Sequence, residues 1–474
     1  MFQFIVRSFE ALGYKEHLDY DVVTSTNPAF NKAVVRVNVY RSHRQTIAYI
    51  QPQHAERASH AELLVIDEAA AIPLPLVKAL FGPYLVFLSS TVNGYEGTGR
   101  SLSLKLIQQL RNQAGSKGDG VSGRTLREVT LEEPIRYSNG DRVEKWLHNL
   151  LCLDCTKSSP PLAGGCPHPK ECELYFVERD TLFSYHKASE QFLQDMMSLY
   201  VSSHYKNTPN DLQMLSDAPA HQLYVLLGPN AAKSGSRPDI LCVVQVCMEG
   251  KIARSSAMSG LAQGAKSNGD LIPWTVSQQF QDPEFASLSG ARVVRIATHP
   301  NLVKMGYGTR ALQILSQYFS GGIIGNADEV HGNAELKSDD VIGIGSSSLL
   351  SDELRPRTNL PPMLVALTDR PPEILHWIGV SYGITSELHK FWSKGGYVPV
   401  YLRQTANDIT GEHTCIMLKQ LQPANLSSVG GGAVLPADEW CSALTQDFRR
   451  RFVQLLGYDS GVYVFDLGYA ISFM

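Results

Sequence analysis

The sequence predicts an α/β chain built as two units, a parallel-sheet domain over residues 1–129 and a second α/β domain over residues 179–420. Two observations support this. In the first unit, continuous apolar runs of strand length alternate with helix-like stretches, which is typical of strands buried on both faces of a parallel sheet. In the second unit, a strand passes through a glycine turn directly into an amphipathic helix. The length of 474 residues agrees, since one ordinary core does not accommodate so many.

Three apolar runs define the strands of the first unit. Val34–Val39 and Leu63–Ile66 are rich in β-branched residues, and Tyr84–Leu88 has the same strand length. A helix is predicted over Leu102–Arg111. Residues 130–178 then form a connecting segment that contains cysteines.

The second unit alternates helices and strands up to residue 420. Its helix over Thr309–Phe319 has one apolar stripe, which predicts a face buried against a sheet. Residues 321–355 are rich in Gly, Ser and Asp and are expected to be a flexible insertion. The other predicted elements are helices over Ser189–His204 and through Phe391–Trp392, and strands over Leu223–Leu227, Ile240–Met248, Arg292–Thr298, Val380–Ile384, Val398–Leu402 and Cys415–Leu418.

The composition, with 43% hydrophobic and 19% charged residues, is that of a folded protein. A formal net charge of −4 gives no support for nucleic-acid binding, so an RNA partner would need local basic patches such as Arg449–Arg451, for which a solvated helix face is the alternative. No apolar run approaches the roughly 20 residues that cross a bilayer, and the N-terminus lacks the pattern of a signal peptide. We therefore expect no membrane association and a cytosolic or nuclear protein whose eight cysteines stay reduced.

Two acids follow one of the predicted strands. Asp67 and Glu68 come directly after Leu63–Ile66, at the end of a strand where ligands bind in open α/β sheets. In a nucleotide hydrolase, Asp67 would hold Mg²⁺ and Glu68 would orient or deprotonate the attacking water. The alternative is an ordinary helix start, where acids are favoured in the first turn.

The stretch after the next strand also suggests nucleotide chemistry. Ser89–Arg100 (SSTVNGYEGTGR) resembles the Ser/Thr-containing helicase motif that senses the γ-phosphate of ATP, and a Gly-rich connection is the alternative. The sequence has no G-x-x-x-x-G-K-[ST] loop, the motif that cradles the phosphates in such hydrolases. We therefore expect the chain to be truncated and not to bind ATP in the usual way.

A second motif lies in the second unit. The strand in RVVRIATHP (Arg292–Pro300) leads into MGYGTR (Met305–Arg310). A strand that runs through Gly-x-Gly into a helix exposes unpaired N–H groups beside a positive helix end, which suits a pyrophosphate. A simple tight turn is the commoner explanation of Gly-x-Gly alone. The order of elements around it, ending in FWSKGGY (Phe391–Tyr397), is typical of a GNAT acetyltransferase, in which acetyl-CoA lies between splayed strands.

The connecting segment contains four cysteines and a histidine with ligand chemistry. Cys152 and Cys155 have a spacing that suits zinc, whereas Cys166 and Cys172, with His168 between them, are spaced irregularly. Two interpretations stay open, a structural zinc knuckle or reduced cysteines packed as small hydrophobic side chains.

Five long segments resemble the RNA cytidine acetyltransferases, which make N(4)-acetylcytidine in small-subunit rRNA and in tRNA. They are VIDEAAAIPLPLVK (Val65–Lys78), NGYEGTGRSLSLKLIQQLR (Asn93–Arg111), SHYKNTPNDLQMLSDAPAH (Ser203–His221), GDLIPWTVSQQFQD (Gly269–Asp282) and VPVYLRQTANDITGEH (Val398–His413). The likeness runs from near residue 1 to about Leu456 and is strongest to eukaryotic members. It implies a partial RecA/helicase-like ATPase domain over 1–129, a GNAT domain over 179–420, and the truncated start of a C-terminal RNA-binding region over 421–474.

The resemblance also implies binding residues. Acetyl-CoA contacts would fall on Ile296, Ala297 and Thr298 and on the turn formed by Val303, Lys304, Met305, Gly306, Tyr307, Gly308 and Thr309. Lys394 stands where the family has an arginine near the cofactor, so it keeps a point charge and loses the bidentate fork. The family's Gln-x-x-Gly-x-Gly turn begins here with Val303, and Lys304 is able to attract a phosphate. Arg136 stands where the family contacts ATP, alongside Asp67 and Glu68 with Mg²⁺.

The implied reaction is attack of the exocyclic amine of cytosine on the thioester of acetyl-CoA. That amine is a poor nucleophile, so the site must position it, polarise the thioester carbonyl and remove a proton. His204 is the first candidate base and His186 the second, since histidine titrates in the right range. ATP hydrolysis in the helicase-like half would remodel or load the RNA.

The resemblance further implies rRNA and tRNA as partners, a tRNA-binding adaptor, small-subunit processing factors, a homodimer, and a nuclear, nucleolar location. Two other functions stay open. A GNAT enzyme acting on protein lysine or a small amine would not need the helicase-like half, which argues against it. A non-catalytic remnant that binds RNA or partner proteins would account for the missing phosphate loop and for Val303 and Lys394.

Overall fold

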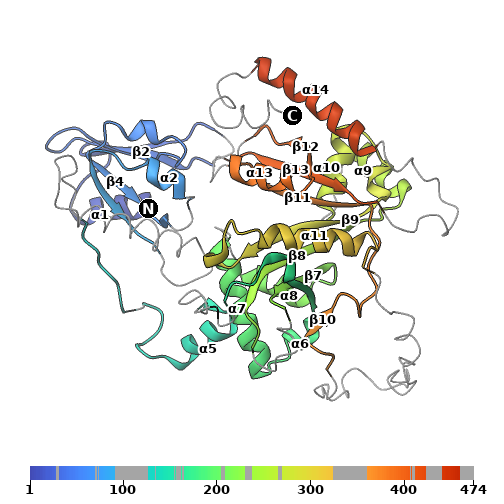
Figure 1. Ribbon diagram of the computed structural model, residues 1–474. Helices are drawn as coiled ribbons and strands as arrows, with labels where there is room; N and C mark the ends of the chain where they lie inside the picture. The colour runs from blue at the N-terminus through green and yellow to red at the C-terminus, as the bar shows by residue number, and fades with distance from the viewer. Residues whose placement is uncertain are drawn as a thin grey trace, which may run out of the picture. The chain divides into compact units, whose positions relative to one another are not determined.

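The computed structural model divides the chain into two compact units. The first contains Met1–Asp67 and Ile72–Ser89, and most of the remaining chain belongs to the second (Figure 1). The structure describes residues 1–27, 31–69, 72, 74–90, 126–133, 135–153, 155, 162, 165–203, 209–229, 237–264, 269–323, 360–405, 407, 412–422 and 440–458. The predicted helix over Leu102–Arg111 and nearly all of the predicted insertion lie outside these residues. Within them, no helix is both long enough and apolar enough to cross a membrane.

The first unit has two small sheets. Its elements are α1 (Phe2–Ala11), β1 (Tyr20–Thr24), β2 (Val34–Val39), β3 (Gln45–Ala48), the 3-10 helix η2 (Ala55–Ala58), β4 (Leu63–Ile66), α2 (Leu74–Ala79) and β5 (Leu85–Leu88). Strands β1, β2 and β3 form an antiparallel sheet around buried Tyr20, Val37 and Val39. Strands β4 and β5 pair in parallel.

The prediction of one parallel sheet buried on both faces is therefore only partly right. The strand over 34–39 exists, but short connections join it to antiparallel neighbours on both sides. In β4, Leu64 and Ile66 are buried, whereas the side chains that alternate with them, Leu63 and Val65, are 52% and 49% exposed. A strand pattern of this kind covers one face only.

The second unit is built on one eight-stranded sheet with the order β10-β6-β7-β8-β9-β11-β13-β12. Its strands are β6 (Glu173–Val177), β7 (His221–Leu227), β8 (Ile240–Gly250), β9 (Ser289–Thr298), β10 (Leu364–Ala366), β11 (Trp377–Gly383), β12 (Val398–Leu402) and β13 (Thr414–Gln420). All neighbours are antiparallel except β9 and β11, which are parallel. The strands predicted for this unit are all present.

Helices cover both faces of this sheet (Figure 1). The helices of this unit are α5 (Arg142–Leu150), η6 (Pro169–Glu171), α6 (Arg179–Leu182), α7 (Lys187–Ser203), α8 (Pro209–Asp217), α9 (Arg254–Gln263), α10 (Leu271–Phe280), η8 (Phe285–Ser287), η9 (Pro300–Leu302), α11 (Tyr307–Phe319), α13 (Ser386–Lys394) and α14 (Trp440–Tyr458), of which α5 has no buried residue. Side chains of α7 and α8 share a core with one face, and those of α11 and α13 share a core with the other. The predicted apolar stripe of the helix after the glycine turn is buried there, at Ala311, Leu312, Leu315, Tyr318 and Phe319.

The last helix packs on the same sheet. Leu444, Phe448 and Phe452 of α14 are buried in its cores. Arg451, from the basic run noted in the sequence, donates to the carbonyl of Gln279 at 2.9 Å and pairs with Asp447 at 2.5 Å. One of the three arginines is thus engaged by the fold itself.

Candidate functional site

Strands β9 and β11 separate partway along their length. They pair only from Gly290 with Trp377 to Val293 with Val380, although β9 continues to Thr298 and β11 to Gly383. On its other side β9 stays paired with β8 as far as Thr298. His299 donates its N–H to Leu241 of β8, so Ala297, two residues earlier, also points toward β8. The edge of β9 that faces β11 therefore offers the backbone N–H and C=O groups of Ile296 and Thr298 to an extended ligand.

A β-bulge lies where the two strands begin to separate. The β8–β9 register shifts between Gln245 and Val246, whose partners are Arg295 and Val293, so Val294 is the extra residue. Before the bulge, Val293 belongs to the core under α11; after it, Ala297 belongs to the core under α7. The bulge thus resets which side chains of β9 face each helical layer.

The predicted glycine turn connects β9 to α11. The buried ring of His299 accepts a hydrogen bond from the N–H of Asn301 at 3.3 Å and so starts η9. Lys304 and Gly306 then take left-handed backbone angles, with φ of 67° and 96°. Gly306 is the N-cap of α11 and supplies no side chain, so the first amides of the helix are left to a ligand at its positive end. This arrangement suits an anion such as pyrophosphate.

Gly308 brings the turn against both strand and helix. A Cβ added to it would lie 3.3 Å from Thr298 Oγ1 and 3.6 Å from both Ile296 Cδ1 and Phe391 Cζ. The structure therefore brings together Ile296, Thr298 and Gly308, which the resemblance assigned to one site, and adds Phe391 from α13. A side chain larger than a methyl group at position 308 would clash with these neighbours.

The remaining predicted cofactor residues take different positions. Val303 and Met305 are 55% and 51% exposed, whereas the side chain of Tyr307 is buried. Lys304 Nζ pairs with Glu387 Oε1 at 3.1 Å, and both side chains are largely exposed. Lys394 is exposed at the end of α13, one helical turn after Phe391. Of the two lysines, only Lys304 belongs to the turn itself.

The cysteine-containing segment packs against this turn. The hydroxyl of Tyr307 donates to the carbonyl of Pro167 at 2.6 Å, and Arg310 donates to the carbonyl of Lys170 at 3.2 Å. The ring of Pro169 lies 3.8 Å from a Cβ added at Gly306. The sequence contained no signal that residues 140 positions apart would be in contact. The packing of this segment against the turn was therefore not predicted.

Two of the four cysteines of the connecting segment lie in different cores. Cys152 is buried in the core under α7, whereas Cys172 is buried in the core on the opposite face of the sheet. Burial raises the pKa of the Cys152 thiol to about 11, which disfavours the thiolate that zinc requires. Among the residues that the structure describes, no group of three or more His, Cys, Asp or Glu is placed to hold a metal ion. The packed-hydrophobe interpretation fits Cys152 and Cys172, and zinc binding does not.

A short polar chain on α13 was not anticipated from the sequence. The Tyr382 hydroxyl, on β11, lies 3.4 Å from Nδ1 of buried His389, whose Nε2 lies 3.4 Å from Ser393 Oγ. Burial lowers the pKa of His389 and raises the pKa of Tyr382, so both are neutral at pH 7. The spacing of four residues between His389 and Ser393 is the one signal that the sequence contained.

The two candidate bases differ in position. His204 lies outside the described residues. His186 is exposed and precedes α7, accepting from the N–H of Ala188 at 3.4 Å. At 1.5 Å per residue, it lies about 21 Å along the helix from Tyr200, the α7 residue beside β9. This separation counts against His186 as the base.

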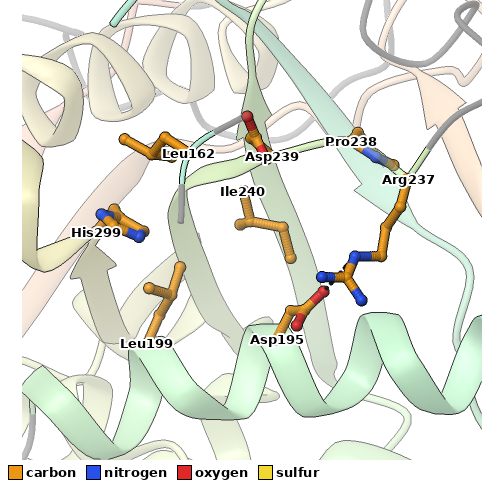
Figure 2. Close-up of a pocket in the computed structure, with 8 residues that line it drawn as sticks. All are labelled: Leu162, Asp195, Leu199, Arg237, Pro238, Asp239, Ile240 and His299. Carbon is orange, nitrogen blue, oxygen red and sulfur yellow. Dashed lines mark ion pairs between the residues drawn. The ribbon is translucent and has the colours of Figure 1, made fainter. Parts of the chain in front are cut away.

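A polar hollow lies between α7 and the start of β8 (Figure 2). Asp195 of α7 pairs with Arg237 at 3.0 Å, and His299 lines another side of the hollow (Figure 2). Burial raises the pKa of the Asp195 carboxyl, an effect that Arg237 opposes. The volume of about 10 Å³ has room for about one water molecule and not for a nucleobase.

In the first unit, Asp67 at the end of β4 contacts Ser89, which follows the neighbouring strand β5. The hydroxyl of Ser89, after β5, donates to Asp67 Oδ1 at 2.6 Å, and its N–H donates to the carbonyl of Ile66 at 2.9 Å. Glu68 follows with a left-handed φ of 48°. The structure thus places Asp67 beside Ser89, the first residue of the Ser/Thr stretch, at the carboxyl ends of two parallel strands, where nucleotide sites form. Arg136 is an exposed residue of the second unit.

Two family models match separate parts of the chain. Residues 195–422 match the family GNAT acetyltransferase 2, and residues 1–154 match the helicase domain of RNA cytidine acetyltransferase NAT10/TcmA. The RNA cytidine acetyltransferases of Homo sapiens and Saccharomyces cerevisiae are 55% and 54% identical to this chain over 97% of its length, which is 45% of theirs. Among solved structures, the ribosomal-protein-S18-alanine N-acetyltransferase of Escherichia coli aligns 99% of its chain with 56% of this one, at 8% identity and a TM-score of 0.26.

The second unit is therefore an acetyltransferase domain of the GNAT class, preceded by a helicase-like segment. The chain belongs to the RNA cytidine acetyltransferase family. It spans about 45% of the length of the curated relatives that it matches.

Proposed function

We propose that the chain is the catalytic part of an RNA cytidine acetyltransferase, which transfers acetyl from acetyl-CoA to the exocyclic amine of cytidine. The observation that carries the proposal is the unpaired edge of β9 at Ile296–Thr298 beside the glycine turn that starts α11. An extended pantetheine arm fits the strand edge, and a pyrophosphate fits the first turn of the helix. The names of the curated relatives supply the substrate class.

Each residue of this site has a definite task in the reaction. Backbone N–H groups on the free edge of β9, those of Ile296 and Thr298, donate to the thioester carbonyl and stabilise the negative charge that develops there. Amides of Gly306–Thr309 hold the pyrophosphate and fix the thioester relative to the strand. The cytosine amine attacks the carbonyl carbon, the C–S bond breaks, and CoA leaves as the thiol. His204 is the proposed acceptor of the amine proton, which then passes to the leaving thiolate to give the CoA thiol.

The helicase-like segment has a separate role in the proposal. Asp67 and Glu68, at the end of β4, would hold Mg²⁺ and orient water for ATP hydrolysis, with Arg136 as a further ATP contact. Tight binding of ATP also requires residues that bind its phosphates, in addition to Asp67, Glu68 and Arg136. ATP turnover would then load or remodel the RNA without entering the acetyl chemistry.

The proposed substrates are small-subunit rRNA and tRNA, with a tRNA-binding adaptor and small-subunit processing factors as protein partners. We further propose a homodimer that works in the nucleolus. These assignments rest on the likeness to the named family and are testable with purified components.

The first test is binding of acetyl-CoA to the purified chain by titration calorimetry. Gly306→Glu places a side chain and a negative charge at a φ of 96°, where the phosphates would lie, and should abolish binding. Gly264→Glu is the matched control, since Gly264 ends α9 with a φ of 63° and open space around an added Cβ. Equal affinity of the parent and the Gly306 variant would contradict the assigned turn.

The second test is transfer itself. The chain is incubated with labelled acetyl-CoA and a small-subunit rRNA fragment, with and without ATP, and nucleosides are analysed by mass spectrometry for N(4)-acetylcytidine. Label on cytidine supports the proposal. Binding of acetyl-CoA with label only on protein lysine would replace it with a protein acetyltransferase, and binding without any transfer would indicate a non-catalytic remnant.

A further inference from the structure

A segment outside both family matches packs against the glycine turn. The matches cover residues 1–154 and 195–422, so residues 165–172, here called the η6 segment, belong to neither. The hydroxyl of Tyr307, the first residue of α11, donates to the carbonyl of Pro167 at 2.6 Å. Tyr307 is only 1% exposed, so water competes little for this hydrogen bond.

Two further contacts join the η6 segment to the same end of α11. Arg310, the fourth residue of the helix, donates to the carbonyl of Lys170 at 3.2 Å. The ring of Pro169 lies beside Gly306, the N-cap of the helix, 3.8 Å from the position of an added Cβ. The η6 segment therefore lies along the start of α11 from its N-cap to its fourth residue.

The η6 segment is itself held in one conformation. Nδ1 of His168 accepts from a backbone N–H of η6 at 3.2 Å, and Pro169 takes the first position of this 3-10 helix, where its fixed φ suits the turn. Cys172 is buried in the core under α11 and leads directly into β6. On the other side, Pro167 Cγ lies 3.3 Å from a Cβ added at Gly228, just after β7. The sheet thus supports the segment, and the segment supports the turn.

The backbone of the glycine turn takes angles that need such support. Lys304 has a φ of 67° and Gly306 a φ of 96°. A left-handed backbone at a residue with a Cβ persists only where its surroundings fix it. The first amides of α11, which are proposed to bind the pyrophosphate, have no partner within the helix. Contacts from outside the turn are therefore needed to keep these amides in the arrangement that a ligand recognises.

We propose that the η6 segment is a positioning element of the acetyl-CoA site, which holds the glycine turn in the conformation that presents its amides to the pyrophosphate. This inference rests on the proposed function. The hydroxyl of Tyr307 acts through the turn without touching the cofactor, so it is a positioning group, and Arg310 provides the second attachment. The cofactor site thus depends on residues outside the range that matches the acetyltransferase family.

The first variant is Tyr307→Phe in the full chain, which removes the hydroxyl and keeps the ring in the core. One hydrogen bond shifts the equilibrium between the binding and relaxed forms of the turn by no more than its own contribution, about ten-fold. We therefore expect the Kd for acetyl-CoA, measured by titration calorimetry, to rise about 3- to 10-fold, while kcat at saturating acetyl-CoA stays unchanged. Pro169→Gly changes only the η6 segment and should raise the Kd about 2- to 5-fold.

Tyr318→Phe is the matched control. Tyr318 lies on the same helix and is also buried, and its hydroxyl donates to the carbonyl of Pro371 at 3.2 Å, at the opposite end of α11. Its replacement should lower the free energy of unfolding and leave the Kd for acetyl-CoA within about two-fold. An equal rise of the Kd in both tyrosine variants would show a general loosening of α11 and overturn the inference. An unchanged Kd in both Tyr307→Phe and Pro169→Gly would overturn it as well.

Hydrogen exchange separates this inference from the proposed function. Without ligand, the amides of residues 303–309 should exchange faster in Tyr307→Phe and Pro169→Gly than in the parent, and at the parent's rate in Tyr318→Phe. If the parent chain binds no acetyl-CoA, the proposed function fails, and this exchange alone decides whether the η6 segment fixes the turn. Equal exchange in the parent and both of the first two variants would then refute that role too. Should Tyr307→Phe fail to fold, Pro169→Gly provides the same comparison.

Discussion

Replacing Glu387 by Gln should strengthen acetyl-CoA binding. Glu387 of α13 neutralises Lys304 at 3.1 Å, on the turn where the pyrophosphate is proposed to bind. Because both side chains are more than 70% exposed, the ion pair contributes little to stability, and its loss should leave the fold intact. The variant removes a like charge from the neighbourhood of the phosphates and leaves the Lys304 ammonium to them.

The magnitude follows from the geometry. If a phosphate oxygen occupies the side of Nζ opposite to Glu387, the two anions lie about 6 Å apart, twice the length of the present ion pair. In water, a carboxylate and a doubly charged pyrophosphate at that distance repel by about 1.4 kcal/mol, and 0.15 M salt reduces this to about 0.7 kcal/mol. The Kd for acetyl-CoA should therefore fall about three-fold.

Titration calorimetry at two salt concentrations tests this reasoning. At about 1 M salt the Debye length is near 3 Å, so the gain should shrink to about 1.4-fold or less. Glu284→Gln is the control, because it makes the same change of net charge at an ion pair with Arg254 of 2.8 Å, on another part of the domain. A gain that is independent of salt, or an equal gain in the control, would refute the argument.

Three further outcomes are expected. Glu249→Gln should lower the free energy of unfolding, measured by urea denaturation, by about 3 kcal/mol, since its buried carboxylate binds Arg292 at 2.6 Å and also accepts from the N–H of Ile272, the second residue of α10; a change under about 1 kcal/mol would contradict this. Burial lowers the pKa of His389, so at pH values near 6.5, the ordinary histidine pKa, the unfolded chain binds more protons than the folded one. The free energy of unfolding should therefore rise with pH in this range, and its slope against pH should be shallower in His389→Asn. The purified chain should contain less than about 0.1 equivalent of zinc by elemental analysis, because Cys152 and Cys172 belong to opposite cores, and stoichiometric zinc would show that interpretation to be wrong.

Local patterns predicted most of the second unit. The stripe on α11 and the strand-length apolar runs mark elements whose burial is encoded within a few residues, and the structure confirms them. The pairing partners of strands are not encoded locally. Val34–Val39 has the composition of a parallel strand, yet its neighbours in the chain are close enough to pair with it in antiparallel fashion.

The candidate site shows the same limit. Gly306 and Gly308 were identifiable because a left-handed turn and a close contact demand glycine, which the sequence displays directly. The hydrogen bond from Tyr307 to the carbonyl of Pro167 joins residues far apart in the chain, and no spacing rule reaches that far. The ion pair of Arg295 of β9 with Asp211 of α8, at 2.9 Å, follows from the bulge at Val294, and a single extra residue in a strand leaves no mark in an apolar pattern.

The short parallel pairing of β9 with β11 has a consequence for how the domain responds to its ligand. Strands β6 to β9 and strands β11 to β13 meet along a seam of only four residue pairs. A ligand bound in the widening gap would contact strands of both halves. By mass action, acetyl-CoA at 100 times its Kd would add about 2.7 kcal/mol to the free energy of unfolding. The concentration of the cofactor would thus set the stability of the domain as well as the occupancy of its site.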